Sequence, residues 1–114
     1  MLPAHIRLRM VIDLFRELDE SMPIQTALTF IVIAEASDRN APVIAKDVEK
    51  ELGLSNSSAV RNVQALTLTS WNGKPGADAV VQIPDPSDGR AKRLALTPRG
   101  RRIWERMKRA LEKE

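Results

Sequence analysis

The stretch of this 114-residue sequence that most constrains its fold is AKDVEKELGLSNSSAVRNVQALTL, residues 45–68. Apolar residues recur at helical spacing up to Leu52, and Gly53 is suited to end that helix as its C-cap. Ser55 is a good N-cap, because its hydroxyl accepts from unpaired N–H groups of the next helix, which then starts at Asn56. The sequence therefore predicts two helices joined by a tight turn, a helix-turn-helix.

The second of these helices, predicted over residues 56–68, has two different faces. Ala59, Val63 and Leu66 follow at i, i+4 and i+7 and form an apolar stripe. The opposite face has short polar side chains, an arginine, a glutamine and no acidic residue. It suits the floor of a DNA major groove, where Arg and Gln form paired hydrogen bonds with base edges. An ordinary polar helix surface is the alternative interpretation. The candidate contacts on this helix are Asn56, Ser57, Ser58, Arg61 and Gln64.

A β-hairpin is predicted after this pair of helices. Residues 80–83 and 93–96 are rich in β-formers. Asp-Pro-Ser-Asp-Gly between them is a turn, which Asp and Pro start and whose Gly89 is free to take positive φ. A two-stranded hairpin directly after a helix-turn-helix is the wing of a winged helix. Its tip, residues 85–92, includes Arg90 and Lys92 as candidate DNA contacts.

Two short segments flank the helix-turn-helix. Residues 72–76 contain four turn-formers in five positions and predict a loop, whose Lys74 is a candidate phosphate contact. Val43 and Ile44, before the first helix of the pair, are expected to form a short edge strand.

Three further helices complete the pattern. A broad apolar stripe predicts an amphipathic helix within residues 5–20. Ser21 and Pro23 announce a second helix, which runs to about Ala36 and which we place at the centre of the core because its apolar residues are nearly continuous. Thr97 and Pro98 start a last helix over residues 98–112. The core candidates of the second helix are Ile24, Ala27, Leu28, Ile31, Val32 and Ala34.

The fold class predicted from this order is a mainly α winged helix-turn-helix with a small β-hairpin wing. Its elements run helix, helix, short strand, helix, helix, strand, wing, strand, helix. The length of 114 residues suits one domain over residues 1–114.

Charge is distributed unevenly along the chain. Residues 1–54 have a net charge of −3 and residues 55–114 a net charge of +6, which together give +3. Such asymmetry is typical of a polyanion-binding surface, although a basic solvated helix contributes to it too. The absence of cysteine excludes disulfides. The longest apolar run, residues 27–34, is far below the roughly 20 residues of a spanning helix, so we expect a cytoplasmic, nucleoid-associated protein with no membrane partner.

Enzymatic chemistry has little support in this sequence. His5 is the sole histidine, there is no thiol, and no Gly-rich phosphate loop follows a strand. Turn formation explains Asp85 and Asp88 better than a metal site does. We therefore expect no catalysis, no cofactor and no bound metal.

Two segments of this sequence are VIAKDVEKELGLSNSSAVRNVQAL and DPSDGRAKRLALTPRG. Together they resemble the winged helix-turn-helix of the MarR family of transcriptional regulators. The second segment is the more specific. It has an Asp-x-Arg at the wing tip, Asp88 and Arg90, followed by a Leu-Thr-x-x-Gly helix start at residues 96–100. The resemblance covers residues 22–104 and implies that helix 56–68 reads the major groove while Arg90 reaches the adjacent minor groove. For Arg90, the alternative is a salt bridge to Asp85 or Asp88.

The expected function is that of a sequence-specific double-stranded DNA-binding protein, a transcriptional repressor. A single winged helix covers few base pairs, so a homodimer on a palindromic operator is expected. Helices 5–20 and 98–112 are the candidate interface, although they could instead cover each other within one subunit. The interface residues would be Ile6, Met10, Leu14, Ile103, Met107 and Leu111.

The sequence departs from the family pattern in two ways. Family members usually continue into two long helices that complete the dimer and help enclose a small-molecule pocket, whereas this sequence stops at Glu114, which leaves an effector ligand open. The loop at residues 71–78 also looks longer than the usual link into the wing. Other functions compatible with the pattern are a winged-helix protein-interaction module and a replication, partition or architectural DNA-binding factor of a plasmid or phage.

Overall fold

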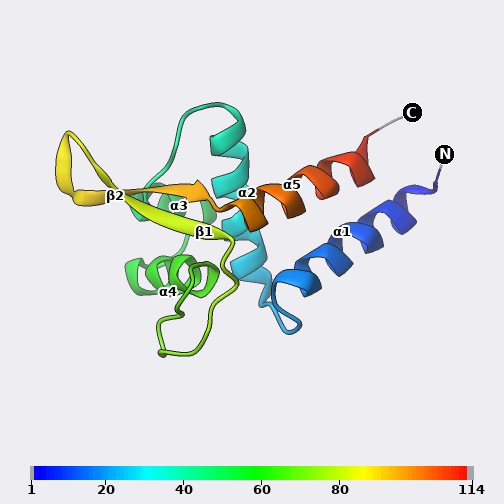
Figure 1. The fold of residues 1–114 in the computed structure, drawn as a ribbon, viewed down its shortest axis with the longest axis horizontal. Coiled ribbons are helices and arrows are strands. Elements are labelled where there is room, and N and C mark those ends of the chain that lie inside the picture. The colour runs from blue at the N-terminus through cyan, green and yellow to red at the C-terminus, as the bar shows by residue number, and fades with distance from the viewer. Residues whose placement is uncertain (1, 113–114) are drawn as a thin grey trace.

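The computed structural model describes residues 2–112, which form five helices and one antiparallel hairpin (Figure 1). The elements in chain order are α1 (Ala4–Leu18), α2 (Ile24–Asp38), α3 (Ala45–Leu52), α4 (Asn56–Leu66), β1 (Val80–Asp85), β2 (Asp88–Leu96) and α5 (Pro98–Leu111). This is the predicted winged helix-turn-helix. Figure 1 shows the wing β1–β2 projecting at one end of the molecule and the free ends of α1 and α5 at the other, along a longest dimension of 47 Å.

Several helix boundaries lie where the sequence predicts them, because local capping chemistry decides them. Gly53 ends α3 in the left-handed conformation, with φ at 65°. The Ser55 hydroxyl accepts the Ser58 N–H at the start of α4, and the Thr97 hydroxyl accepts the Gly100 N–H at the start of α5. All three ends depend on residues within three positions of the boundary.

Other local predictions are wrong. Val43 and Ile44 form no strand, although the Val43 carbonyl accepts one hydrogen bond from Leu94 at 2.9 Å beside the described two-stranded sheet. Helix α4 ends at Leu66 rather than at residue 68. The wing turn itself lies within the predicted segment, at Pro86 and Ser87, and Gly89 does not use the positive φ that was open to it.

Helix α2 differs from its prediction at both its start and its inward face. It starts after Pro23, while the Ser21 N–H bonds the Asp19 carboxylate in the preceding turn. Ile24 is 77% exposed and Leu28 43%, so neither belongs to the core. The buried residues of α2 are Thr26, Thr29, Phe30, Ile33, Ala34 and Ala36.

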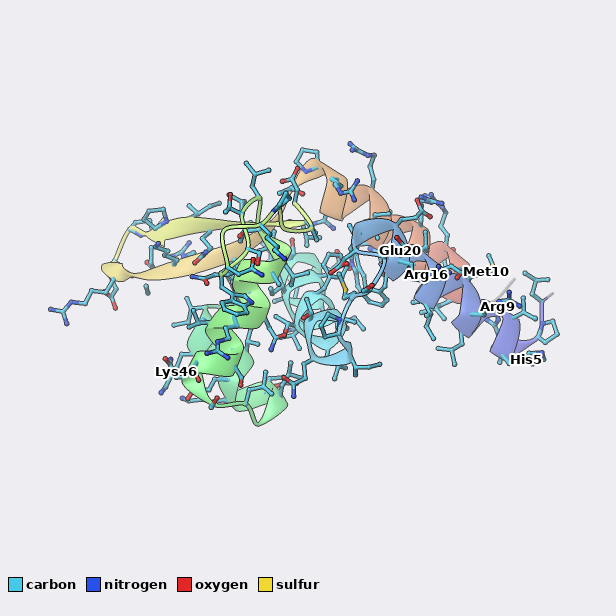
Figure 2. The ribbon with its side chains drawn as sticks, turned by 90° about the horizontal axis from the view of Figure 1, so that it is seen from below. His5, Arg9, Met10, Arg16, Glu20 and Lys46 are labelled. Carbon is cyan, nitrogen blue, oxygen red and sulfur yellow. The ribbon has the colours of Figure 1, made fainter. Side chains whose placement is uncertain are left out.

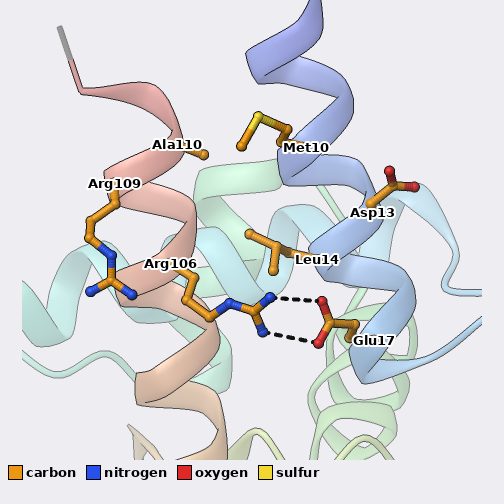
Figure 3. Close-up of a pocket in the computed structure, with 7 residues that line it drawn as sticks. All are labelled: Met10, Asp13, Leu14, Glu17, Arg106, Arg109 and Ala110. Carbon is orange, nitrogen blue, oxygen red and sulfur yellow. Dashed lines mark hydrogen bonds and ion pairs between the residues drawn. The ribbon is translucent and has the colours of Figure 1, made fainter. Parts of the chain in front are cut away.

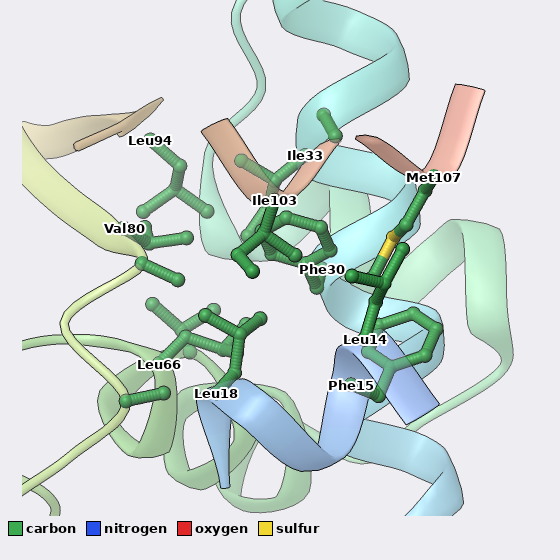
Figure 4. Close-up of a cluster of buried hydrophobic side chains, with 14 of the residues drawn as sticks. Leu14, Phe15, Leu18, Phe30, Ile33, Leu66, Val80, Leu94, Ile103 and Met107 are labelled. Atoms are coloured by element: carbon green, nitrogen blue, oxygen red, sulfur yellow. The ribbon is translucent and has the colours of Figure 1, made fainter. Parts of the chain in front are cut away.

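A single hydrophobic core joins all the helices and the base of the wing (Figure 4). Phe30 in α2 lies edge-on to two rings, with centroid distances of 5.9 Å to Phe15 of α1 and 6.2 Å to Trp104 of α5. Burial of these side chains supplies most of the stabilising free energy. The fully or nearly fully buried members from the other elements include Leu14, Leu18, Leu66, Val80, Leu94, Ile103 and Met107.

The start of α5 is held against the chain just before β1. The Thr97 N–H donates to the Ala79 carbonyl at 3.0 Å, and the Thr97 hydroxyl donates to the Asp78 carbonyl at 2.7 Å. Gly100, in the first turn of α5, passes so close that a Cβ there would collide with the Ala79 carbonyl oxygen. This close approach gives a physical reason for the glycine in the Leu-Thr-x-x-Gly pattern.

A polar cluster fastens the end of α2 to α5. Asp38 accepts from the Trp104 indole N–H at 2.8 Å, from Lys108 at 3.0 Å and from Arg101 at 2.9 Å. The Trp104 bond, together with those from Lys108 and Arg101, lowers the pKa of Asp38 from 3.8 to about 2. The cluster is therefore strongest while Asp38 is ionised.

Within residues 2–112, no helix is long and apolar enough to cross a membrane. The same part of the chain contains no group of three or more His, Cys, Asp and Glu side chains arranged to hold a metal ion.

We predict that Gly100→Ala destabilises the protein by about 1–3 kcal/mol, because the new methyl group must displace the Ala79 backbone. Urea denaturation followed by circular dichroism measures the change. Gly89→Ala is the matched control, since a Cβ at Gly89 meets no atom within 4 Å, and its effect should stay within about 0.5 kcal/mol. Equal effects of the two substitutions would contradict the proposed collision.

Ionisation of Asp38 should make the free energy of unfolding depend on pH in the acid range. Its pKa is lowered on folding, so its contribution is fully present above about pH 4 and disappears as the pH falls toward 2. We predict that Asp38→Asn lowers stability at pH 7 by about 1 kcal/mol and flattens the decline between pH 4 and 2. Thermal melting across this range compares the two proteins. Parallel pH profiles would show that Asp38 does not cause the decline.

Candidate nucleic-acid interface

The N-terminus of α4 presents a group of serine hydroxyls. The Ser55 hydroxyl caps the helix through the Ser58 N–H at 3.2 Å and donates to the Ser58 hydroxyl at 3.0 Å, with the Ser57 hydroxyl 3.3 Å away. The positive end of the helix dipole lies here, which favours an anion such as a phosphate. Of the predicted contacts, Ser57 is exposed and Ser58 is half-buried.

Helix α4 is held against α2 by packing and by hydrogen bonds of Asn62. Ala59, Val63 and Leu66 are buried against the core, as the sequence predicts. Asn62 accepts from the buried Thr26 hydroxyl of α2 at 2.8 Å and donates to the Ser58 carbonyl at 2.9 Å. This partly buried hydrogen bond to α2 helps to set the orientation of α4, since the Thr26 hydroxyl would lose its partner if the helices moved apart.

The predicted groove-reading residues on α4 have different environments. Arg61 is exposed, and Gln64 is partly buried. Asn56 is exposed, but its amide lies 3.4 Å from the Glu49 carboxylate of α3, which also pairs with Lys46 at 3.5 Å. Lys46 of α3 is therefore linked to the start of α4 through Glu49, which neutralises its charge.

Arg61 makes a cation–π contact with a tryptophan that the sequence patterns did not indicate. Its guanidinium carbon lies over the Trp71 ring, 5.1 Å from the centroid. Trp71 belongs to the loop after α4 and is 56% exposed. A signal for it exists in the sequence, because no acidic residue occurs between Glu51 and Asp78 and Trp71 is the one aromatic residue in that stretch.

The loop that carries Trp71 folds back under α4 (Figure 1). The two sides of the loop meet at an isolated β-bridge between Thr69 and Pro75, and the Ser70 N–H donates to the Lys74 carbonyl at 2.8 Å. Gly76 packs so closely on the end of α4 that a Cβ would collide with the Thr67 carbonyl oxygen. Lys74, predicted to contact phosphate, is exposed on this loop.

The wing is stiffened by an ion pair that does not involve Arg90. Arg93 donates to the Asp85 carboxylate at 3.3 and 3.4 Å, and the Ser87 hydroxyl donates to the same group at 2.7 Å. The Ser87 hydroxyl and N–H and then Arg93 lower the pKa of Asp85 to about 2. The salt bridge considered for Arg90 is therefore made by Arg93, while Arg90 and Lys92 are exposed on the wing.

Three of the predicted dimer contacts lie in the core of one subunit. Leu14 is 7% exposed, Ile103 6% and Met107 1%, because α1 and α5 pack against each other within the chain. The prediction that these three side chains face a partner is wrong. Ile6 is half-buried, while Met10 and Leu111 are exposed.

A cleft of about 450 Å³ separates the outer parts of α1 and α5 (Figure 3). Arg106 reaches across it and donates to both oxygens of Glu17, at 3.0 and 3.2 Å. Met10 lines the cleft on the α1 side and Arg109 on the α5 side. This ion pair holds the two helices together on the side away from the apolar core.

Comparison with known proteins gives likeness in structure alone. No family model matches the chain, and no curated protein sequence matches it. Among solved structures, Rv1404 from Mycobacterium tuberculosis is similar with a TM-score of 0.66 and 20% identity over 94% of this chain and 65% of its own. The S. aureus MepR–DNA complex is similar with a TM-score of 0.67 and 14% identity over 93% of this chain and 77% of MepR.

A third similar structure is a mutant of E. coli MarR in complex with operator DNA, with a TM-score of 0.59 and 21% identity over 96% of this chain and 74% of MarR. The chain spans just under two thirds of the length of Rv1404. At these identities the likeness concerns the fold. The chain thus shares the winged helix-turn-helix fold of the solved Rv1404, MepR and MarR structures.

Proposed function

We propose that this protein is a sequence-specific double-stranded DNA-binding transcriptional regulator that acts as a dimeric repressor in the cytoplasm, at the nucleoid. The observation that carries the proposal is the exposed, acid-free face of α4, with Arg61 on it, at the same end of the molecule as the wing that bears Arg90 (Figure 1). A protein-interaction module would more often expose acidic or apolar side chains on that face. Two of the similar structures, MepR and MarR, are in complex with DNA.

In the proposed complex, α4 enters the major groove. Arg61 and Gln64 read base edges, since both side chains form paired hydrogen bonds with bases. The serine hydroxyls and N–H groups at the start of α4 bind a phosphate, as does Lys74 beside the helix. Such phosphate contacts fix the register of the helix but do not distinguish sequences.

The wing occupies the neighbouring minor groove in this proposal. Arg90 enters the groove, which is favoured where an A·T tract narrows it and increases its negative potential. Lys92 neutralises an adjacent phosphate. The ion pair of Arg93 with Asp85 supports this role, because it stiffens the hairpin without consuming the charge of Arg90.

The proposed dimer uses the end of the molecule opposite the wing. Exposed apolar side chains gather on α1 and nearby segments, and such patches mark interaction surfaces. Met10 and Leu111, which the sequence predicts as contacts, are 40% and 52% exposed. The other large exposed apolar residues there are Leu2, Leu8, Ile12, Ile24 and Leu28.

We predict that Arg61→Ala abolishes base preference at one operator position, a loss of about 1–3 kcal/mol, while weak salt-sensitive binding remains. Fluorescence anisotropy with specific and unrelated duplexes at two salt concentrations measures both effects. Arg9→Ala removes the same charge from α1, at the opposite end from the wing (Figure 2), and should leave the preference intact. Equal loss of affinity on every duplex would show that Arg61 contacts a phosphate. Wild-type affinity that does not change with salt concentration would exclude the DNA-binding function.

Selection from random duplex DNA should recover a palindrome with half-sites about one helical turn apart. Sedimentation should give two chains per duplex, and Met10→Glu should weaken this dimer because it places a charge on the proposed interface. Val81→Glu, at a wing residue of similar exposure, should leave the free protein dimeric. A wild-type protein that stays monomeric on the selected duplex would rule out the dimer.

A further inference from the structure

Trp71 has no role in the hydrophobic core. Of the chain's two phenylalanines and two tryptophans, Phe15 and Phe30 are buried, and Trp104 is half-buried and hydrogen-bonded to Asp38. Trp71 is instead 56% exposed, with the Arg61 guanidinium 5.1 Å from its ring centroid. A ring that is left this exposed contributes little hydrophobic stabilisation to the fold.

The loop holds Trp71 in a defined place. Ser70 and Asn72, on either side of Trp71, are bonded to each other through their side chains at 2.8 Å, and the Asn72 carboxamide also accepts the Lys74 N–H at 3.1 Å. The Gly76 N–H donates to the Leu68 carbonyl at 2.9 Å and closes the base of the loop. The ring is thus carried by a backbone that hydrogen bonds fix at both sides of the tip.

This support matters for Arg61, because a free arginine side chain on a helix surface samples many rotamers. A guanidinium placed over an indole gains cation–π attraction, which restricts those rotamers, and tryptophan is the best aromatic partner. A guanidinium has five N–H donors, and contact with one ring engages only part of them. Arg61 over the Trp71 ring therefore keeps donors for a base edge.

We propose that Trp71 is a positioning residue that pre-organises Arg61 for base recognition, an inference that rests on the proposed DNA-binding function. Pre-organisation reduces the entropy lost when Arg61 engages a base. Removing the ring should therefore weaken discrimination between bases and leave non-specific binding unchanged.

The test compares wild type, Trp71→Ala, Trp71→Phe and Leu68→Ala on the selected duplex and on the same duplex changed at the base whose preference Arg61→Ala abolishes. An exposed cation–π pair corresponds to a factor of about two to five, so Trp71→Ala should lower the affinity ratio by about that factor. Trp71→Phe should retain part of the ratio. Leu68→Ala is the matched control, because Leu68 is a 69% exposed apolar residue of the same loop, and its ratio should not change.

A double-mutant cycle separates positioning from direct contact. If Trp71 acts through Arg61, Trp71→Ala has no further effect in the Arg61→Ala background. The inference is overturned if Trp71→Ala leaves the ratio unchanged, if it weakens binding equally on both duplexes, or if its effect persists without Arg61. Circular dichroism and thermal melting confirm that each variant is folded.

A second measurement needs no DNA. In the proton–nitrogen NMR spectrum of the free protein, the ring current of Trp71 should shift the Arg61 Nε–H signal upfield, and Trp71→Ala should return it to the usual arginine position. An unshifted signal in the wild type would overturn the inference even if DNA binding is confirmed. If wild type selects no DNA sequence but the shift is present, the proposed function fails while the pairing stands.

Discussion

The arrangement of the helices depends on the contacts of the buried Phe30 ring with two other aromatic rings. The Phe30 ring lies edge-on to Phe15 of α1 and to Trp104 of α5, so one side chain of α2 sets the distance to both outer helices. Trp104 in turn bonds Asp38 at the end of α2. The hydrogen bond of Thr26 with Asn62 links α2 to α4 on another face. Helix α2 is therefore the common support of the candidate DNA-binding helix and of the two helices at the opposite end.

The structure changes the meaning of the uneven charge. Much of the positive charge in the second half of the sequence belongs to α5, where it stabilises the fold. Arg99 bonds backbone carbonyls of Ala77 and Glu17, and other cations of α5 pair with carboxylates. These pairs join Arg101 and Lys108 to Asp38, and Arg106 to Glu17. A net charge counted along the sequence therefore overstates the cations available to a polyanion. The proposed interface depends on fewer charges, placed on α4, its loop and the wing.

The sequence predicts those parts of the structure that neighbouring residues decide. Caps and turn-formers place the end of α3 and the starts of α4 and α5, and residue alternation places the strands of the wing. The buried face of α2 is harder to predict, because apolar residues occur on all sides of the helix. No stripe distinguishes Phe30, which is buried, from Ile24, which is exposed. Periodicity also identifies a buried face without identifying what covers it. The apolar faces of α1 and α5 were thus assigned in part to a partner, although Leu14 and Met107 meet inside one chain. The pairing of Trp71 with Arg61 depends on how a loop folds back, which no local pattern encodes.

The loop between α4 and β1 is built largely from backbone hydrogen bonds and from the close approach of Gly76, and Trp71 at its tip contributes nothing to the core. Trp71 can therefore be replaced without loss of core packing, as long as Gly76 and the hydrogen bonds of Ser70 and Asn72 remain. Evolution can alter the side chain beside Arg61 independently of the scaffold. Descendants of one such protein could diverge in the targets that they recognise while keeping the same fold, because the side chain beside Arg61 lies outside the core.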